Sequence, residues 1–416
     1  MARRSCRSSL AIVGCAIAML VVAAGCSSSG SGSTSSTGSS ASGTPLKIGL
    51  ITVVGTALNF TDQVSAANAA IRQVNSEGGI DGHQIQLVFC NEALDPNKGA
   101  ACARDMANDH VMAMVGTLAP TSEQTVNTIL AQAGIAQVGP ETQGPGATDK
   151  NSYLLGAPPI LNEVAYAKFA GLQGAKRVDT ILLDSPITAA DVPTLKKVLP
   201  TVGATLGNVV TSTQQGGDLS PQAAALMKDN PQVVIFNTSP ASAIALMKAM
   251  DQLGYRGTFE TVPNALTLPE IQGLGAEANQ LRFVSTFPPI SATSVPGIQQ
   301  MVEALRAQAA SGDKNVPSTT FTGDYQIDTY TAVMAIQKIA DAAKATDAAS
   351  FQKALNSAMN VNLDGIIPAW TPDKPGPATL PRVSDSDYYF FKWDNGTVQL
   401  VSSDPTDVAS MLQAAP

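Results

Sequence analysis

The sequence predicts an α/β protein with two doubly wound parallel-sheet lobes. Apolar, β-rich segments alternate with segments of helical period from residue 47 onward, and the same rhythm begins again after about residue 160. Alternation of strands and helices with short turns is typical of parallel sheets that are covered by helices on both faces. Roughly 370 residues follow Pro45, which is enough chain for two domains.

The first half opens with an apolar strand and an amphipathic helix. Val64, Ala67, Ile71 and Val74 recur at spacings of three and four, which places them on one helical face. The Gly78-Gly79 pair ends this helix, because glycine adopts left-handed dihedral angles at little cost. The expected elements of this half are strands over Lys47–Val54, Gln84–Cys90 and Val111–Val115, a helix around 64–74, a helix over 97–109, and a helix that opens with a capping box formed by Thr121 and Gln124.

The second half repeats the pattern and ends in a hairpin. Asn395-Gly396 between two β-rich runs is a strong hairpin signal. The expected elements are helices over 162–173, 189–200, 220–229, 241–253, 296–310 and 325–344, strands over Val178–Leu183, 205–211, Val233–Phe236 and 258–261, and hairpin strands over Tyr388–Trp393 and Thr397–Val401.

The N-terminus has the features of a bacterial lipoprotein leader. Three arginines precede an apolar run over Leu10–Ala24, which is shorter than the ~18 residues that a membrane-spanning helix needs. The run ends in Ala23-Ala24-Gly25-Cys26, which resembles a lipobox except that Ala23 stands where leucine is preferred. We therefore expect lipidation of Cys26 at the extracytoplasmic face of the cell membrane; the alternative is ordinary secretion with loss of Cys26.

A polar tether and an acidic body follow the leader. Residues 27–44 are only Ser, Gly, Thr and Ala, a composition typical of a flexible coil with a reach on the order of 25 Å. Removal of the three leader arginines changes the formal net charge from −8 to −11. An acidic body without a basic cluster argues against nucleic acid or anionic lipid as a partner. The lipid anchor is therefore the expected contact with the membrane.

Two cysteines remain in the body, and no motif for catalysis is found. An even pair in an exported protein indicates a Cys90–Cys102 disulfide, with two separate thiols as the alternative. The two cysteines and the scattered His83 and His110 lack the spacing of a metal site, so no metal is expected. The sequence has no Gly-x-Ser-x-Gly elbow, phosphate-loop consensus or metal-binding histidine pair, and we expect neither an enzyme nor a cofactor.

The candidate ligand-binding residues follow the ends of predicted strands. In doubly wound sheets, ligands bind outside the carboxyl ends of the strands. A helix start at Thr121 and Ser122 would also offer free N–H groups to an anion. The candidates are Asn59 and Phe60 after the first strand, Thr117, Thr121 and Ser122 after Val115, Glu141, Thr142 and Gln143 after Val138, and Asn237 and Ser239 in the second lobe.

The order and spacing of several segments resemble type I periplasmic binding proteins of the leucine/isoleucine/valine type, the receptors of branched-chain amino-acid ABC transporters. The matching segments are Lys47-Ile48-Gly49-Leu50, the run from Ile71 to Gly82 with its Gly-Gly-Ile-Asp-Gly end, Asp95-Pro96-Asn97-Lys98, Val115-Gly116, Pro140 and Tyr330-Thr331-Ala332-Val333. The resemblance implies a clamshell that captures a small solute between two lobes and delivers it to an ABC permease complex in the membrane. It also implies three crossing strands, with lobe one over 46–159 and 289–372 and lobe two over 160–288 and 373–416.

The resemblance also bears on the ligand. Relatives that bind amino acids hold the carboxylate with a hydroxyl of the second binding loop and a threonine of the third, and the ammonium with a glutamate of lobe two. Here Pro120, Gln143 and Pro263 occupy those three places. We therefore expect a small carboxylate or an amide rather than a branched-chain amino acid. Two alternatives stay open: an amino-acid binder that uses Glu141, and a receptor that reports its ligand to a membrane signalling partner.

Overall fold

The computed structural model describes residues 43–414 except 57, 143, 186–187 and 189–190. The described residues belong to one compact unit, and Cys26 lies outside them. In this part of the chain, no helix is long and apolar enough to cross a membrane. The strands are β1 (Gly43–Thr52), β2 (His83–Asn91), β3 (Ala113–Val115), β4 (Ala136–Val138), β5 (Ser152–Tyr153), β6 (Arg177–Leu183), β7 (Thr205–Ser212), β8 (Val233–Asn237), β9 (Thr258–Thr261), β10 (Leu281–Ser285), β11 (Asp387–Asp394), β12 (Thr397–Leu400) and β13 (Thr406–Asp407). The α-helices are α1 (Thr61–Ser76), α2 (Pro96–Asn108), α3 (Glu123–Gln132), α4 (Asn162–Leu172), α5 (Asp191–Val198), α6 (Ser220–Met227), α7 (Pro240–Gln252), α8 (Leu268–Gly273), α9 (Pro296–Ala310), α10 (Asp324–Ala343), α11 (Ala348–Ser357) and α12 (Ala409–Ala414).

The first sheet is parallel, with strand order β2-β1-β3-β4-β5. One face packs against α1 and α10 in a core that contains Ile48, Val74 and Val333, and the other packs against α2 and α3 around Met106 and Leu130. The chain passes from β1 to β2 on one side of β1, and then from β2 to β3 on the other side of β1. Such a change of direction opens a crevice at the carboxyl ends of the strands.

The second sheet has the order β12-β11-β10-β9-β8-β6-β7. The strands β7, β6, β8, β9 and β10 are parallel, and the β11–β12 hairpin adds two antiparallel strands next to β10. Helices α4 and α5 cover one face around Phe169 and Leu195, while α6 and α7 cover the other around Leu226 and Met247. The two sheets confirm the predicted α/β class with two doubly wound lobes.

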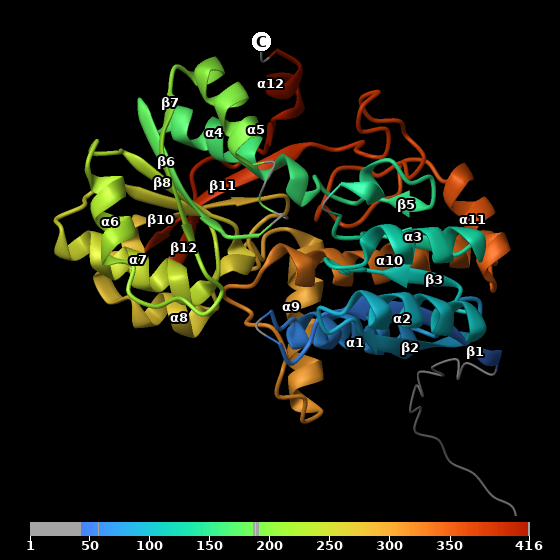
Figure 1. The fold of residues 1–416 in the computed structure, drawn as a ribbon. Coiled ribbons are helices and arrows are strands. Elements are labelled where there is room, and N and C mark those ends of the chain that lie inside the picture. Colours follow the sequence, from blue (N-terminus) through green and yellow to red (C-terminus); the bar gives the residue numbers. More distant parts are fainter. Residues whose placement is uncertain (1–42, 57, 143, 186–187, 189–190, 415–416) are drawn as a thin grey trace, which may run out of the picture. The chain divides into compact units, whose positions relative to one another are not determined.

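Late segments of the chain return to the first sheet. Ile298 of α9, Ile336 of α10 and Phe351 of α11 lie in the same core as Ile48 of β1. Figure 1 shows α9 and α10 beside the elements of the first sheet, although about half of the chain separates them in sequence. This return places the N-terminal end of α10 against strand ends of the first sheet.

Most predicted elements are confirmed, and one local prediction is wrong. The hairpin turns at Asn395 and Gly396, whose φ angles are 48° and 91°. The Thr121 capping box does not form: α3 starts at Glu123 with Ser122 as its N-cap and no side-chain cap. The cause is Glu92, whose carboxylate accepts a hydrogen bond from the Thr121 hydroxyl.

The predicted disulfide joins Cys90 at the end of β2 to Cys102 in α2, with 5.6 Å between the Cα atoms. It closes a loop with a sequence separation of 12 residues. By loop-closure entropy we expect the bond to contribute roughly 3 kcal/mol. Urea unfolding with and without a reductant measures this contribution. A Cys90→Ser/Cys102→Ser variant is the control, since its midpoint should not respond to the reductant; an unchanged wild-type midpoint after verified reduction contradicts the prediction.

Candidate functional site

The N-terminal turns of α10 sit directly on the strand ends of the first sheet. Gly116 and Gly139 follow β3 and β4 with φ angles of 52° and 61°. A Cβ atom at Gly139 would lie 1.9 Å from Oδ1 of Asp328, and one at Gly116 would lie 2.0 Å from Oγ1 of Thr329. Glycine is therefore required at both positions by the backbone angle and by the close approach of α10.

A buried hydrogen-bond network fixes this approach. The Thr52 hydroxyl donates to Oε1 of Gln63 over 2.6 Å. Nε2 of Gln63 donates to the Gly116 carbonyl over 2.8 Å and to Oγ1 of Thr329 over 2.9 Å. The network joins β1, α1, the end of β3 and α10, so the side chains at the start of α10 are held in place relative to the strand ends.

Acidic side chains gather where α10 meets these loops. Glu141 and Asp328 are 7% and 6% exposed. Burial raises the pKa of Glu141 well above its ordinary value, and the charges of Asp328 and Asp324 raise it further. Burial and the charge of Asp324 likewise raise the pKa of Asp328. Asp62 lies nearby in α1, and burial raises its pKa against a hydrogen bond from Gln326.

Asp324 links this acidic region to the second sheet. The Ser285 hydroxyl at the end of β10 donates to Asp324 over 2.6 Å, and the Thr286 N–H donates over 3.1 Å. Burial raises the pKa of Asp324 to about 7 despite these two bonds. The first residue of α10 is therefore bonded to the segment that leaves the second sheet toward the first.

An aromatic pair lies next to the acids. The rings of Phe60 and Tyr325 meet edge to face with 5.3 Å between centroids. The charges of Glu141 and Asp324 act on the Tyr325 phenol, whose pKa is raised mainly by burial. Asn264, after β9, accepts from the Tyr325 N–H over 3.5 Å. Loops of both sheets therefore meet at the start of α10.

The second sheet has an acidic pair at its own carboxyl edge. Nδ2 of Asn237 donates to Asp191 over 2.6 Å. Glu163 and Asp191 are 6% and 8% exposed. Burial and the charge of Asp191 raise the pKa of Glu163 to about 8, while burial raises that of Asp191 to about 6.

The helix start at α3 already holds a carboxylate of the protein. Glu92 is fully buried at the end of β2. Its Oε1 accepts from the Thr121 N–H over 3.1 Å, from the Ser122 hydroxyl over 3.0 Å and from the Thr121 hydroxyl. The groups expected to face a ligand anion are therefore hydrogen-bonded to Glu92.

The remaining predicted residues are mostly tied into local turns. Asn59 accepts from the Gly55 N–H and the Thr61 hydroxyl, and the Thr142 hydroxyl donates to Glu123 and accepts from two backbone N–H groups. Ser239 is the N-cap of α7. Thr117 lies beside Glu141, whose N–H donates to the Thr117 carbonyl over 2.9 Å. Gln143 lies outside the described residues. Ligand contacts by all these residues stay predictions.

Several acids of the two edges were not predicted from the sequence. Glu92, Asp324, Asp328, Glu163 and Asp191 each lie at a strand end or in the first turns of a helix. One signal was available: Asp324 and Asp328 are four residues apart at the start of a predicted helix, a spacing that puts them on one face. Their partners are distant in sequence and could not be assigned from it.

The arrangement of the two sheets and of the chain between them can be compared with that of known proteins. A family model described as "Periplasmic binding protein" matches residues 45–397. The chain belongs to the periplasmic binding protein family. It is an extracytoplasmic solute-binding protein of the ABC-transporter type and not an enzyme.

Three relatives are distant in sequence, but the similarity to this chain extends over nearly the whole length of each of them. A Leu/Ile/Val-binding protein homolog from Brucella melitensis is 24% identical over 376 residues, which is 86% of this chain and 94% of the relative. A substrate-binding periplasmic protein from Ralstonia solanacearum matches with a TM-score of 0.73 at 14% identity, covering 85% of this chain and 99% of its own. A fatty acid transporter substrate-binding protein from Thermomonospora curvata matches with a TM-score of 0.71 at 16% identity, covering 88% and 94%. At these identities the solved structures support the fold of this periplasmic binding protein and leave its ligand open.

Proposed function

We propose that this chain is a lipid-anchored receptor that captures one small solute between the carboxyl edges of its two sheets and delivers it to an ABC permease complex. The observation that supports the proposal best is the meeting of both sheets at the start of α10. Asp324 is bonded to Ser285 of β10, while Asp328 lies against Gly139 after β4. A solute bound there would contact both lobes, as closure of a clamshell requires.

We infer lobe one over 46–159 and 289–372, and lobe two over 160–288 and 373–416. The core of the first sheet includes Ile298, Tyr330 and Phe351, which supports assigning the late helices to lobe one. The pairing of β11 with β10 supports assigning the C-terminal segment to lobe two. The crossings fall near 158–162, 285–289 and 370–375.

The proposed ligand is not a branched-chain amino acid, although the Brucella relative is named for leucine, isoleucine and valine. Pro263 occupies the place of the lobe-two glutamate that such relatives use for the ammonium group. Of the two ligand classes expected from the sequence, an amide has the better support. The hydroxyls of Thr121 and Ser122 are bonded to Glu92, whereas Glu141 offers a buried acceptor for an N–H donor.

Ligand-induced closure tests this function. A solute that prefers the closed form stabilises the folded protein, by about 2.7 kcal/mol at a concentration of 100 times its Kd. We expect a thermal-shift screen of branched-chain amino acids, their 2-oxo acids and short amides to give no shift for leucine, isoleucine or valine. Small-angle scattering with any solute that raises Tm should show a smaller radius of gyration. A saturating solute that leaves the radius unchanged contradicts the clamshell function.

Membrane attachment through Cys26 is tested separately. The mature chain is expected to begin at Cys26 and to carry a diacylglyceryl group, which intact-mass analysis of membrane-extracted protein detects. A Cys26→Ala variant should leave the membrane fraction. Cys15→Ala is the matched control, since Cys15 lies inside the apolar run and should be removed with the leader. Full retention of the Cys26→Ala protein in the membrane would exclude this anchor.

A further inference from the structure

We propose that the ligand carries a cationic nitrogen, which Glu141 and Asp328 of lobe one hold beside the rings of Phe60 and Tyr325. The proposal rests on the function proposed above, in which the carboxyl edges form the ligand site. It places the positive group on the first lobe, at a different position from the lobe-two glutamate of relatives that bind amino acids.

The region around the start of α10 offers buried acceptors without donors. Within the described residues, four atoms around the start of α10 are buried and have no hydrogen-bond partner: Oε1 of Glu141, Oδ1 of Asp328, Oε1 of Gln326 and Oγ1 of Thr117. When the two acids are ionised, their carboxylate oxygens can only accept hydrogen bonds, and the same is true of the Gln326 amide oxygen. The Thr117 hydroxyl can also accept. A buried polar atom without a partner is unfavourable, so a ligand with N–H donors would offset several such costs.

Among the described residues, the carboxyl groups of this region have no counter-charge. None of the ion pairs found among the described residues includes Glu141, Asp328, Asp324 or Asp62. The effects of Asp324 and Asp328 on Glu141 are repulsive, and no lysine or arginine lowers its pKa. A buried carboxylate is stable only when it is paired and hydrogen-bonded. A cationic ligand would supply both the charge and the donors.

The aromatic pair of Phe60 and Tyr325 lies beside these acids. Tyr325 follows Asp324 in the first turn of α10 and is within electrostatic reach of Glu141. Phe60 packs against it from the loop after β1. Aromatic faces attract ammonium groups and also pack against an apolar body. Carboxylates next to aromatic rings therefore fit an amine on a small hydrocarbon skeleton.

Anionic groups are less well served at the same edges. The start of α3, which would suit a ligand carboxylate, already binds the carboxylate of Glu92. The net charge of −11 after leader removal also favours the approach of cations over that of anions. The observations thus favour an amine over the small carboxylate or amide that the sequence alone suggested.

The test compares small probes of similar size whose polar groups differ in charge. Butylamine, putrescine and phenethylamine are measured against butyrate, butyramide and phenylacetate, by thermal shift and by isothermal titration calorimetry on the mature chain. We expect at least one amine to bind, and butyramide and the two carboxylates to bind at least tenfold more weakly than that amine. Glu141→Gln and Asp328→Asn, which remove charge at nearly constant volume, should each weaken that amine at least tenfold.

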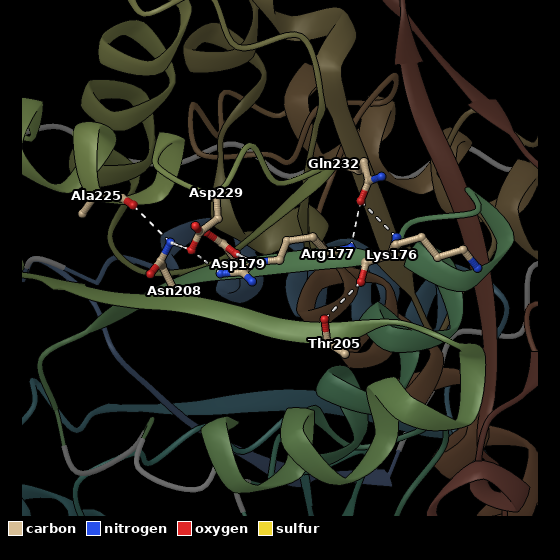
Figure 2. Close-up of polar contacts among 8 residues, drawn as sticks. All are labelled: Lys176, Arg177, Asp179, Thr205, Asn208, Ala225, Asp229 and Gln232. Carbon is tan, nitrogen blue, oxygen red and sulfur yellow. Dashed lines mark hydrogen bonds and ion pairs between the residues drawn. The ribbon is translucent and has the colours of Figure 1, made fainter.

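Asp179→Asn is the matched control variant. Asp179 is fully buried in β6, and its Oδ2 has no hydrogen-bond partner. Burial raises its pKa as it does for Glu141. Asp179 lies near the start of β6, whereas Glu141 lies beyond the end of β4. Figure 2 shows Asp179 next to Arg177, in a network with Asn208 and Asp229. Asp179→Asn should therefore change amine affinity less than twofold, even if it changes stability.

Each outcome decides the matter. Absence of binding by all three amines, or equal affinity of wild type and both site variants, overturns the cationic-ligand inference. Tight binding of butyrate or butyramide with closure in scattering also overturns it, while leaving the receptor function intact. An amine that binds through Glu141 and Asp328 but leaves the scattering radius unchanged supports the cation site and contradicts the clamshell function.

Discussion

Replacing Glu92 with alanine is expected to lower the free energy of unfolding by about 4 kcal/mol. Glu92 is fully buried, and its Oε1 accepts from the N–H and hydroxyl of Thr121 and from the hydroxyl of Ser122. Its Oε2 accepts from the Leu94 N–H over 2.8 Å. The alanine variant leaves these donors unpaired. Three of them lie at the start of α3, where the helix dipole adds a preference for negative charge.

Urea unfolding of the purified mature chain measures this effect. Glu92→Gln keeps the volume but loses the charge and one acceptor, so it should lie between wild type and Glu92→Ala. Glu303→Gln, on an exposed position of α9, should change stability by less than about 0.5 kcal/mol. A Glu92→Ala midpoint equal to that of the wild type would show that water replaces the carboxylate without loss.

Local sequence signals predicted most helices and strands, because these signals act within one element. The helical face of Val64, Ala67, Ile71 and Val74 is buried in α1, apart from the partly buried Val64. Strand β10 was missed as a strand, since Arg282 interrupts its short apolar run. Its burial comes from β9 on one side and from β11, about 100 residues later, on the other. Such partners have no local signature.

The same limit applies to the site. Strand ends could be placed from the sequence, and with them Thr117 and Glu141. Which polar groups stay free depends on contacts between distant residues: Glu92 reaches Thr121 across 29 positions, and Gln63 reaches Thr329 across 266. The capping box was a reasonable local prediction for Thr121, but a buried carboxylate competes more strongly for its hydroxyl. The expected ligand changed for this reason.

Stability is expected to fall as pH rises from about 5 to about 8, and Glu163 should cause much of the fall. Burial, reinforced by the charge of Asp191, raises the pKa of Glu163 from 4.5 to about 8. The surrounding groups that titrate are Asp191 of α5, Tyr166 of α4 and Tyr388 of β11. Among the described residues, none of the ion pairs includes Glu163, so no cation keeps it ionised in the folded state.

The direction follows from proton counting. Between pH 4.5 and about 8 the unfolded chain has released the Glu163 proton while the folded protein still binds it, so each rise in pH favours unfolding. Each pH unit inside this window costs at most about 1.4 kcal/mol per group, which sums to a few kcal/mol for Glu163. Asp191, whose pKa is raised to about 6, acts in the same direction at the lower end of the window.

Urea unfolding at several pH values between about 5 and about 8 measures the slope. Glu163→Gln removes the ionisation and keeps the volume, so this variant should lose less stability across the range and should exceed the wild type at the alkaline end. Some slope should persist in the variant, because burial also raises the pKa of Asp324 to about 7. Glu303→Gln is the control and should keep the full wild-type slope, since that glutamate is exposed. Equal slopes for wild type and Glu163→Gln would mean that Glu163 is ionised in the folded protein, and that a positive charge reaches the edge of the second sheet after all.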